Sequence, residues 1–123
     1  MTKIGKPIVP KISEDQLQKQ VATYLTLKHP HVLWFHAPNG GSRNLFEAVK
    51  LKAMGVKPGV PDIMILSRKL GYYGLAIELK VGKNKPSDFQ KEWLHNLDII
   101  GWKTAVCYTF DEARSIIDDY LKN

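Results

Sequence analysis

The sequence predicts an α/β domain in which a mixed central sheet is flanked by helices on both faces. Short apolar segments rich in branched residues, typical of buried strands, alternate with longer segments whose apolar residues recur at helical spacing. The predicted order is helix, strand, helix, strand, strand, helix, strand, helix, and this alternation favours helices packed against a sheet. With 123 residues, 44% of them hydrophobic, the chain is long enough to bury one core.

Four segments are predicted to be helical. Ser13–Gln16 and Ser87–Gln90 each place a serine three residues before a glutamine, which is the capping-box pattern of a helix start. Leu45–Met54 is predicted to form the second helix, and Asp111 to cap the last one. The residues expected to face the core are Leu17, Val21, Tyr24 and Leu25 in the first helix, Phe89, Trp93, Leu97 and Ile100 in the third, and Ala113, Ile116, Ile117, Tyr120 and Leu121 in the last.

Four shorter segments are predicted to be strands. They are Val32–Ala37, Val60–Leu66, Leu75–Val81 and Lys103–Tyr108. The connection between the second and third of these, Ser67–Gly74, contains two glycines and is typical of a hairpin. We therefore expect those two strands to pair in antiparallel fashion. The chain contains no internal repeat and no low-complexity segment.

Composition and charge restrict the class of protein. Residues 1–12 are expected to form a basic arm, and residues 13–123 a single domain. A formal net charge of +6 favours an anionic partner. No apolar run approaches the ~18 residues of a membrane span, and the start lacks the apolar region of a secretion signal. The lone Cys107 is expected to pack in the core, and the four histidines show no zinc-like spacing with it, so we expect a cytoplasmic protein.

The most informative pattern is the pair Pro61-Asp62 and the later Glu78 and Lys80. Side chains alternate faces along a strand, so Glu78 and Lys80 share one face, and the hairpin brings Asp62 close to them. An ordinary solvated sheet face is the alternative interpretation. The same face also carries three apolar residues, Met64, Leu66 and Ala76. Charges at the end of an otherwise covered face therefore suggest the edge of a cleft.

The chemistry of these groups favours a divalent metal. Two carboxylates only a few ångströms apart repel each other unless a cation lies between them. Ligation by oxygen alone suits Mg²⁺ or Mn²⁺, which accept phosphate oxygens and can lower the pKa of a bound water. Lys80 would then be placed to orient the water and to stabilise the charge that grows on phosphorus, and the Leu79 carbonyl is a further candidate ligand.

Two further polar residues have two possible roles each. Glu14 opens the first helix, where a carboxylate favours the helix dipole, but it could equally reach the cleft and contribute to a metal site. Gln90 could serve the capping box alone, or its amide could reach the attacking water or a phosphate.

Basic and glycine-rich loops supply candidate contacts to DNA. Lys83 and Lys85 directly follow the strand that carries Glu78 and Lys80, where contacts to phosphate would position a backbone without reading its sequence. The loop before the second helix offers backbone amides, a hydroxyl and a guanidinium, which suit a phosphate, although the same loop could be only a turn. Its residues are Asn39, Gly40, Gly41, Ser42 and Arg43.

Taken in order, Glu14, Gly59–Ile63, Ile77–Lys80 and Ser87–Trp93 give the chain a resemblance to a known family. From Ser13 to Leu121 it resembles the VRR-NUC (virus-type replication-repair nuclease) family, which belongs to the PD-(D/E)xK superfamily with a restriction-endonuclease-like core. The resemblance implies roles for individual residues: Asp62 and Glu78 bind a divalent metal with help from the Leu79 carbonyl, Lys80 is the catalytic lysine, Gln90 is an active-site residue and Glu14 is an acidic contributor.

The resemblance also implies an activity. Stand-alone members of this kind look like phage proteins and are similar in fold to archaeal-type Holliday junction resolvases. We therefore expect a Mg²⁺-dependent, structure-selective DNA endonuclease that acts as a homodimer on branched DNA, located in the cytoplasm of the bacterial host if phage-encoded. Cleavage in the superfamily releases a 3′ hydroxyl and a 5′ phosphate. A nuclease for flaps, nicks or single strands, a non-catalytic DNA-binding module and a basic protein-interaction module remain alternatives.

Overall fold

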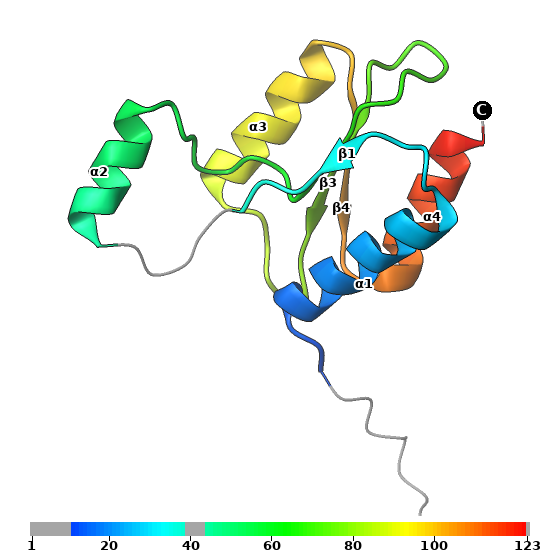
Figure 1. The fold of residues 1–123 in the computed structure, drawn as a ribbon, viewed down its shortest axis with the longest axis horizontal. Helices are drawn as coiled ribbons and strands as arrows, with labels where there is room; N and C mark the ends of the chain where they lie inside the picture. The colour runs from blue at the N-terminus through cyan, green and yellow to red at the C-terminus, as the bar shows by residue number, and fades with distance from the viewer. Residues whose placement is uncertain (1–10, 39–43, 123) are drawn as a thin grey trace, which may run out of the picture.

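The structure is a computed structural model that describes residues 11–38 and 44–122, and these residues form a sheet between two layers of helices (Figure 1). The elements are α1 (Glu14–Lys28), β1 (Trp34–Phe35), α2 (Leu45–Ala53), β2 (Ile63–Ile65), β3 (Leu75–Leu79), α3 (Asp88–Ile99), β4 (Lys103–Cys107) and α4 (Phe110–Leu121). Their order confirms the predicted order, and each strand is shorter than predicted. Within the described residues, no helix is long and apolar enough to cross a membrane.

The sheet has four strands in the order β1-β2-β3-β4. β1 and β2 pair in antiparallel fashion, as do β2 and β3, whereas β4 runs parallel to β3. The parallel pair requires a crossover connection, which α3 supplies. Ile63 lies opposite Ile77 in the β2–β3 register, so the residue before β2 lies beside the last residues of β3. The predicted hairpin is therefore present, and it brings Asp62 next to Glu78.

The larger part of the core lies between the sheet and the helices α1 and α4. Alternate residues of β2 and β3 point into this layer, where both helices cover them. Its buried members are Leu17, Val21, Leu25, Ile63, Ile65, Leu75, Ile77, Leu79, Cys107, Ala113, Ile117 and Tyr120. The expectation that Cys107 packs in the core is thus confirmed. β3 is buried along its whole length because helices cover both of its faces.

The opposite face of the sheet is covered by α3. Met64, Ala76 and Leu97 are buried there, with Trp93 and Trp102 packed around them. Glu78 follows Ala76 on the same face, since it is two residues further along β3. The smaller apolar cluster therefore ends at a carboxylate.

Three local predictions about burial are wrong. Phe89 and Ile100 were expected to face the core, but their side chains are 59% and 61% exposed. α3 contacts the sheet with Trp93 and Leu97 at the centre of its inner side, so residues at its first and last turns lie at the border of that contact. Leu66 was expected on the covered face, but it follows the last residue of β2 and is exposed beyond the reach of α3.

The helix starts follow local sequence rules, with one correction. Both predicted capping boxes, at Ser13 and Ser87, are present. The cap of α4 is Thr109 and not Asp111, because the Thr109 hydroxyl accepts a hydrogen bond from the backbone N–H of Glu112 at 3.1 Å. Asp111 instead lies in the first turn of α4, where its charge still favours the helix dipole.

The segment that leads into Asp62 is fixed by a close backbone approach. Gly59 is buried and has φ +86°, a conformation that favours glycine. A Cβ at this position would lie 2.6 Å from the backbone carbon of Phe89, in the first turn of α3. Gly59 therefore anchors this segment to α3 three residues before Asp62.

Replacement of Gly59 by alanine is expected to destabilise the fold by about 2–5 kcal/mol, because backbone strain and a clash with Phe89 add together. Gly55 is the matched control, since it also has positive φ (+99°) but a Cβ there would meet nothing within 4 Å. Gly55→Ala should cost about 1–2 kcal/mol for strain alone. Urea unfolding measures both losses, and equal losses would contradict the role given to the Phe89 contact.

Candidate active site

Two carboxylates meet where β2 begins and β3 ends. Asp62 precedes β2, and its Oδ2 accepts a hydrogen bond from the backbone N–H of Leu79 at 2.7 Å. Glu78 belongs to β3, and only 1% of its surface is exposed. The antiparallel register, which the hairpin dictates, brings the two residues together although they are far apart in sequence.

Lys80 joins this pair to the first helix. Its Nζ lies 3.3 Å from Glu78 Oε2 and 3.4 Å from Glu14 Oε1. Burial lowers the pKa of Lys80, but the negative charges of Glu78 and Glu14 oppose this, and the net result is a pKa above its ordinary value of 10.5. Lys80 is therefore a buried cation at neutral pH and acts as a hydrogen-bond donor.

Gln90 closes the predicted capping box and also contacts the site through Glu78, while its contact with a water or a phosphate stays a prediction. Its Oε1 accepts a hydrogen bond from the Ser87 backbone N–H at 2.8 Å, which completes the capping box of α3. Its Nε2 donates to Glu78 Oε2 at 3.0 Å. One amide thus closes the helix start and orients the Glu78 carboxylate. Glu78 Oε2 is therefore contacted by two donor groups, the Lys80 ammonium and the Gln90 amide.

Glu14 lies at the helix start and also contacts Lys80 of the candidate site. It is the first residue of α1, where a carboxylate favours the helix dipole, and it pairs with Lys80. Its side chain is about half exposed, in contrast to that of Glu78. Glu14 therefore contributes negative charge next to the ammonium group, and its direct ligation of a metal stays a prediction.

The negative charge of Glu78 is only partly compensated by its neighbours. Burial and the nearby Asp62 carboxylate raise the pKa of Glu78 from 4.5 to about 8, and Lys80 opposes this only in part. Its second oxygen, Oε1, is buried and has no hydrogen-bond partner. Buried polar atoms normally find a partner, so an unpaired carboxylate oxygen is an opening for a further group.

A hard divalent cation fits this donor set. Asp62 and Glu78 offer only oxygen, and the neighbouring Leu79 can add its carbonyl. In the part of the chain that the structure describes, no group of three or more His, Cys, Asp or Glu side chains is arranged to hold a metal. The protein would therefore supply few ligands, which suits Mg²⁺ because this ion keeps several waters and accepts substrate phosphates.

His36 is a site neighbour that the sequence analysis did not assign. Its Nδ1 lies 2.6 Å from the Asp62 carbonyl oxygen. A carbonyl only accepts, so Nδ1 carries the proton and Nε2 faces away from this bond. The antiparallel pairing of β1 with β2 places His36 there, one residue beyond the Phe35–Met64 pair. The pairing of β1 with β2 is the feature from which the position of His36 beside Asp62 follows.

The candidate DNA contacts lie in two loops. Lys83 and Lys85 are exposed in the loop that follows β3, close in sequence to Lys80. The loop residues Asn39, Gly40, Gly41, Ser42 and Arg43 lie outside the described residues, as does most of the basic arm. Of the candidate DNA contacts, Lys83 and Lys85 are thus the ones whose positions the structure describes.

Comparison with known proteins identifies the family. The sequence profile of the VRR-NUC domain matches residues 10–111. A solved structure of a VRR_NUC domain protein superimposes with a TM-score of 0.77 at 30% sequence identity, covering 93% of this chain and 92% of the other. No curated protein matches the chain. The profile match extends over most of the sequence and includes every candidate site residue, so the chain belongs to the VRR-NUC domain family.

Proposed function

We propose that this protein is a metal-dependent, structure-selective DNA endonuclease that acts as a homodimer on branched DNA such as a four-way junction. Membership of the VRR-NUC family gives it a nuclease-type fold and DNA as its class of substrate. The observation that carries the proposal is the buried Glu78 carboxylate, which faces Asp62, is held at one oxygen by Lys80 and Gln90, and has no partner at the other. A purely structural carboxylate has no need of a free buried oxygen.

The residues divide the chemical work among them. Asp62 and Glu78, with the Leu79 carbonyl, would hold a Mg²⁺ or Mn²⁺ ion, which when bound polarises the scissile phosphate and lowers the pKa of a water. Lys80 keeps its proton and donates to the attacking water or to the phosphate oxygens as negative charge grows. Gln90 keeps the Glu78 carboxylate in one orientation. Hydrolysis leaves a 3′ hydroxyl and a 5′ phosphate.

Charge and size support DNA as substrate and two copies as the active unit. The net charge of +6 favours a polyanion, and Lys83 and Lys85 are placed beside the site to bind phosphates. A domain of 14.0 kDa offers little surface with which to hold a junction. A two-fold dimer matches the two-fold symmetry of a four-way junction and brings one active site to each of two strands.

The activity is tested with a panel of defined DNA structures and Mg²⁺ or Mn²⁺. We expect cleavage of a four-way junction to be faster than that of a flap, a nicked duplex, a single strand or a plain duplex. Asp62→Asn and Lys80→Ala should each lose at least about 100-fold in rate, because each removes charge needed at the reacting phosphate. Asp98→Asn, an exposed carboxylate on α3, is the matched control and should keep full activity.

Each result of the panel decides one part of the proposal. Faster cleavage of flaps, nicks or single strands would replace the junction as substrate while keeping the metal-dependent nuclease. DNA binding without cleavage under any metal condition would instead make the protein a binding module. Full activity of Asp62→Asn would contradict the assigned site.

Metal affinity is expected to rise with pH, because a cation must displace the proton of Glu78. The pKa of Glu78 in the metal-free protein is about 8, so Mn²⁺ binding should tighten by up to about tenfold per pH unit below that value and level off above it. Calorimetry in buffers of different ionisation enthalpy measures both the affinity and the released proton. Glu78→Gln should abolish binding. An affinity that is constant from pH 6 to 8 would show that Glu78 does not exchange a proton for the metal.

A further inference from the structure

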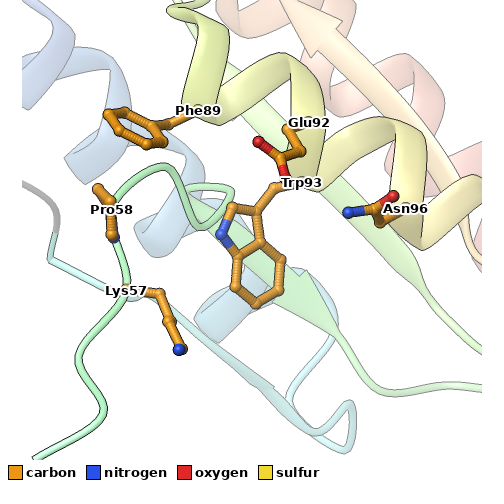
Figure 2. Close-up of a pocket in the computed structure, with 6 residues that line it drawn as sticks. All are labelled: Lys57, Pro58, Phe89, Glu92, Trp93 and Asn96. Carbon is orange, nitrogen blue, oxygen red and sulfur yellow. The ribbon is translucent and has the colours of Figure 1, made fainter.

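A groove lies between α3 and the segment that precedes β2. Its volume is about 460 Å³, and it is lined by Lys57, Pro58, Phe89, Glu92, Trp93 and Asn96. The four residues from α3 recur at the spacing of one helix face, and the other two form the opposite wall. Figure 2 shows the Trp93 ring extending from α3 toward this wall, with Phe89 and Asn96 on either side of it. The volume is within the range of about 300–1,000 Å³ that is typical of sites for small organic groups.

Two aromatic side chains give the groove flat apolar surfaces. Phe89 is 59% exposed, although it belongs to a helix that packs on the sheet. Trp93 packs on the cluster of Met64, Ala76 and Leu97, and it also lines the groove. Contact with the core restricts the orientation of the Trp93 ring, so its surface in the groove is held in place before a ligand binds. Aromatic surfaces of this kind are the platforms on which nucleobases stack.

The polar groups of the groove differ in what they can bind. The Glu92 carboxylate accepts hydrogen bonds, the Asn96 amide both donates and accepts, and Lys57 provides an ammonium group. All three side chains are exposed. In the part of the chain that the structure describes, they take part in none of the hydrogen bonds and ion pairs that hold the fold together. They are therefore available to a ligand.

Together these groups match the parts of an unpaired nucleotide. The aromatic rings offer surfaces to the face of a base. Glu92 and Asn96 lie one helix turn apart on the same side of α3, where they can contact the edge of that base. Lys57, on the opposite wall, suits a phosphate. A base inside a duplex is stacked and paired, so only an unpaired base can use all of these contacts.

Both walls of the groove continue into the candidate active site. Phe89 is followed directly by Gln90, whose amide donates to Glu78. On the opposite wall, Pro58 lies four residues before Asp62. A DNA strand that lies at the two carboxylates is therefore close to the groove. This position favours a nucleotide of the DNA strand over a free nucleotide as the ligand.

We propose that the groove binds an unpaired base of the DNA substrate near the cleaved phosphate. The inference rests on the proposed function for DNA as the ligand, and it does not depend on how many copies form the active unit. The base stacks against Phe89 and Trp93, and Glu92 accepts a hydrogen bond from an amino group on its edge. Cytosine carries an amino group where thymine carries a carbonyl oxygen. Glu92 therefore favours cytosine over thymine, because a carboxylate has no proton to donate to a carbonyl.

Binding of fluorescein-labelled single-stranded decamers, measured by anisotropy in EDTA, tests this preference without cleavage. The wild-type chain should bind oligo-dC at least about fivefold more tightly than oligo-dT. Glu92→Gln should reduce the preference to less than about twofold, because the glutamine amide can also donate to thymine. Glu112→Gln, an exposed glutamate in the first turn of α4, is the matched control and should keep it. A preference that is absent in the wild-type chain, or unchanged in Glu92→Gln, would overturn the proposal.

Replacement of Phe89 by alanine tests stacking. Phe89→Ala should weaken binding of single-stranded oligo-dC by at least about tenfold and binding of a plain duplex by less than about twofold, because paired bases do not enter the groove. Alanine keeps the backbone and Cβ that lie against Gly59, so the circular dichroism should not change. Leu27→Ala, an exposed apolar residue on α1, is the matched control. Equal losses for single strand and duplex would overturn the proposal, since the groove would then contact only the DNA backbone.

Tryptophan fluorescence locates the bound base. Oligo-dC should quench the emission, and Trp93→Phe should remove this quenching while it keeps an aromatic ring against the core. Quenching that persists in Trp93→Phe would place the base elsewhere and overturn the proposal.

Deoxycytidine monophosphate distinguishes a free nucleotide from a strand as the ligand. It should bind at least about 100-fold more weakly than the oligo-dC decamer, because it lacks the neighbouring phosphates. Equal affinities would make the groove a site for free nucleotides and overturn the proposal. Asp62→Asn should keep the preference for cytosine, so failure of the groove and failure of the proposed nuclease activity are distinguishable.

Discussion

The burial of the Glu78 carboxylate is the constraint on which the rest of this structure depends. Glu78 lies in β3, the strand that is covered on both faces, and a buried charge is costly unless other groups compensate for it. Compensation comes from separate parts of the chain: Lys80 follows the same strand, and Gln90 opens α3. Even so, the raised pKa shows that the compensation is partial. A fold built only for stability would place an apolar residue here.

The first turn of α3 contacts both the segment that leads to Asp62 and the Glu78 carboxylate. Phe89 receives the close approach of Gly59, which leads to Asp62, while the next residue, Gln90, holds Glu78. The two carboxylates are thus each tied to adjacent residues of one helix turn. On the sheet side, the hydrogen bond that the Leu79 N–H donates to Asp62 holds this carboxylate against β3. Asp62 is therefore held by a backbone N–H and Glu78 by the side chains of Gln90 and Lys80, and a flexible surface pair has no such support.

The order of all eight elements could be predicted from the sequence because the signals that define them are local. A capping serine, an apolar stripe and two glycines between strands each act within a few residues. The predictions that were wrong depend on which surfaces meet: Phe89 has the spacing of a core residue, yet it lies at the border of the α3 contact. His36 was missed for the same reason, since its contact with Asp62 exists only once β1 pairs with β2. For Gln90, spacing predicted the capping box, whereas its bond to Glu78 could not be predicted because it depends on how α3 packs against β3.

The segment between α2 and β2 leads from an exposed helix to the first carboxylate of the candidate site. It begins at the helix ending of Gly55, lies beside α3 at Lys57 and Pro58, packs on Phe89 at Gly59 and ends at Asp62. Because Gly59 leaves no room for a Cβ against the Phe89 backbone, the path of the segment is fixed only three residues before Asp62. The position of this carboxylate therefore depends on the contact between the segment and α3, and a change at Gly59 reaches the candidate site without touching any of its side chains.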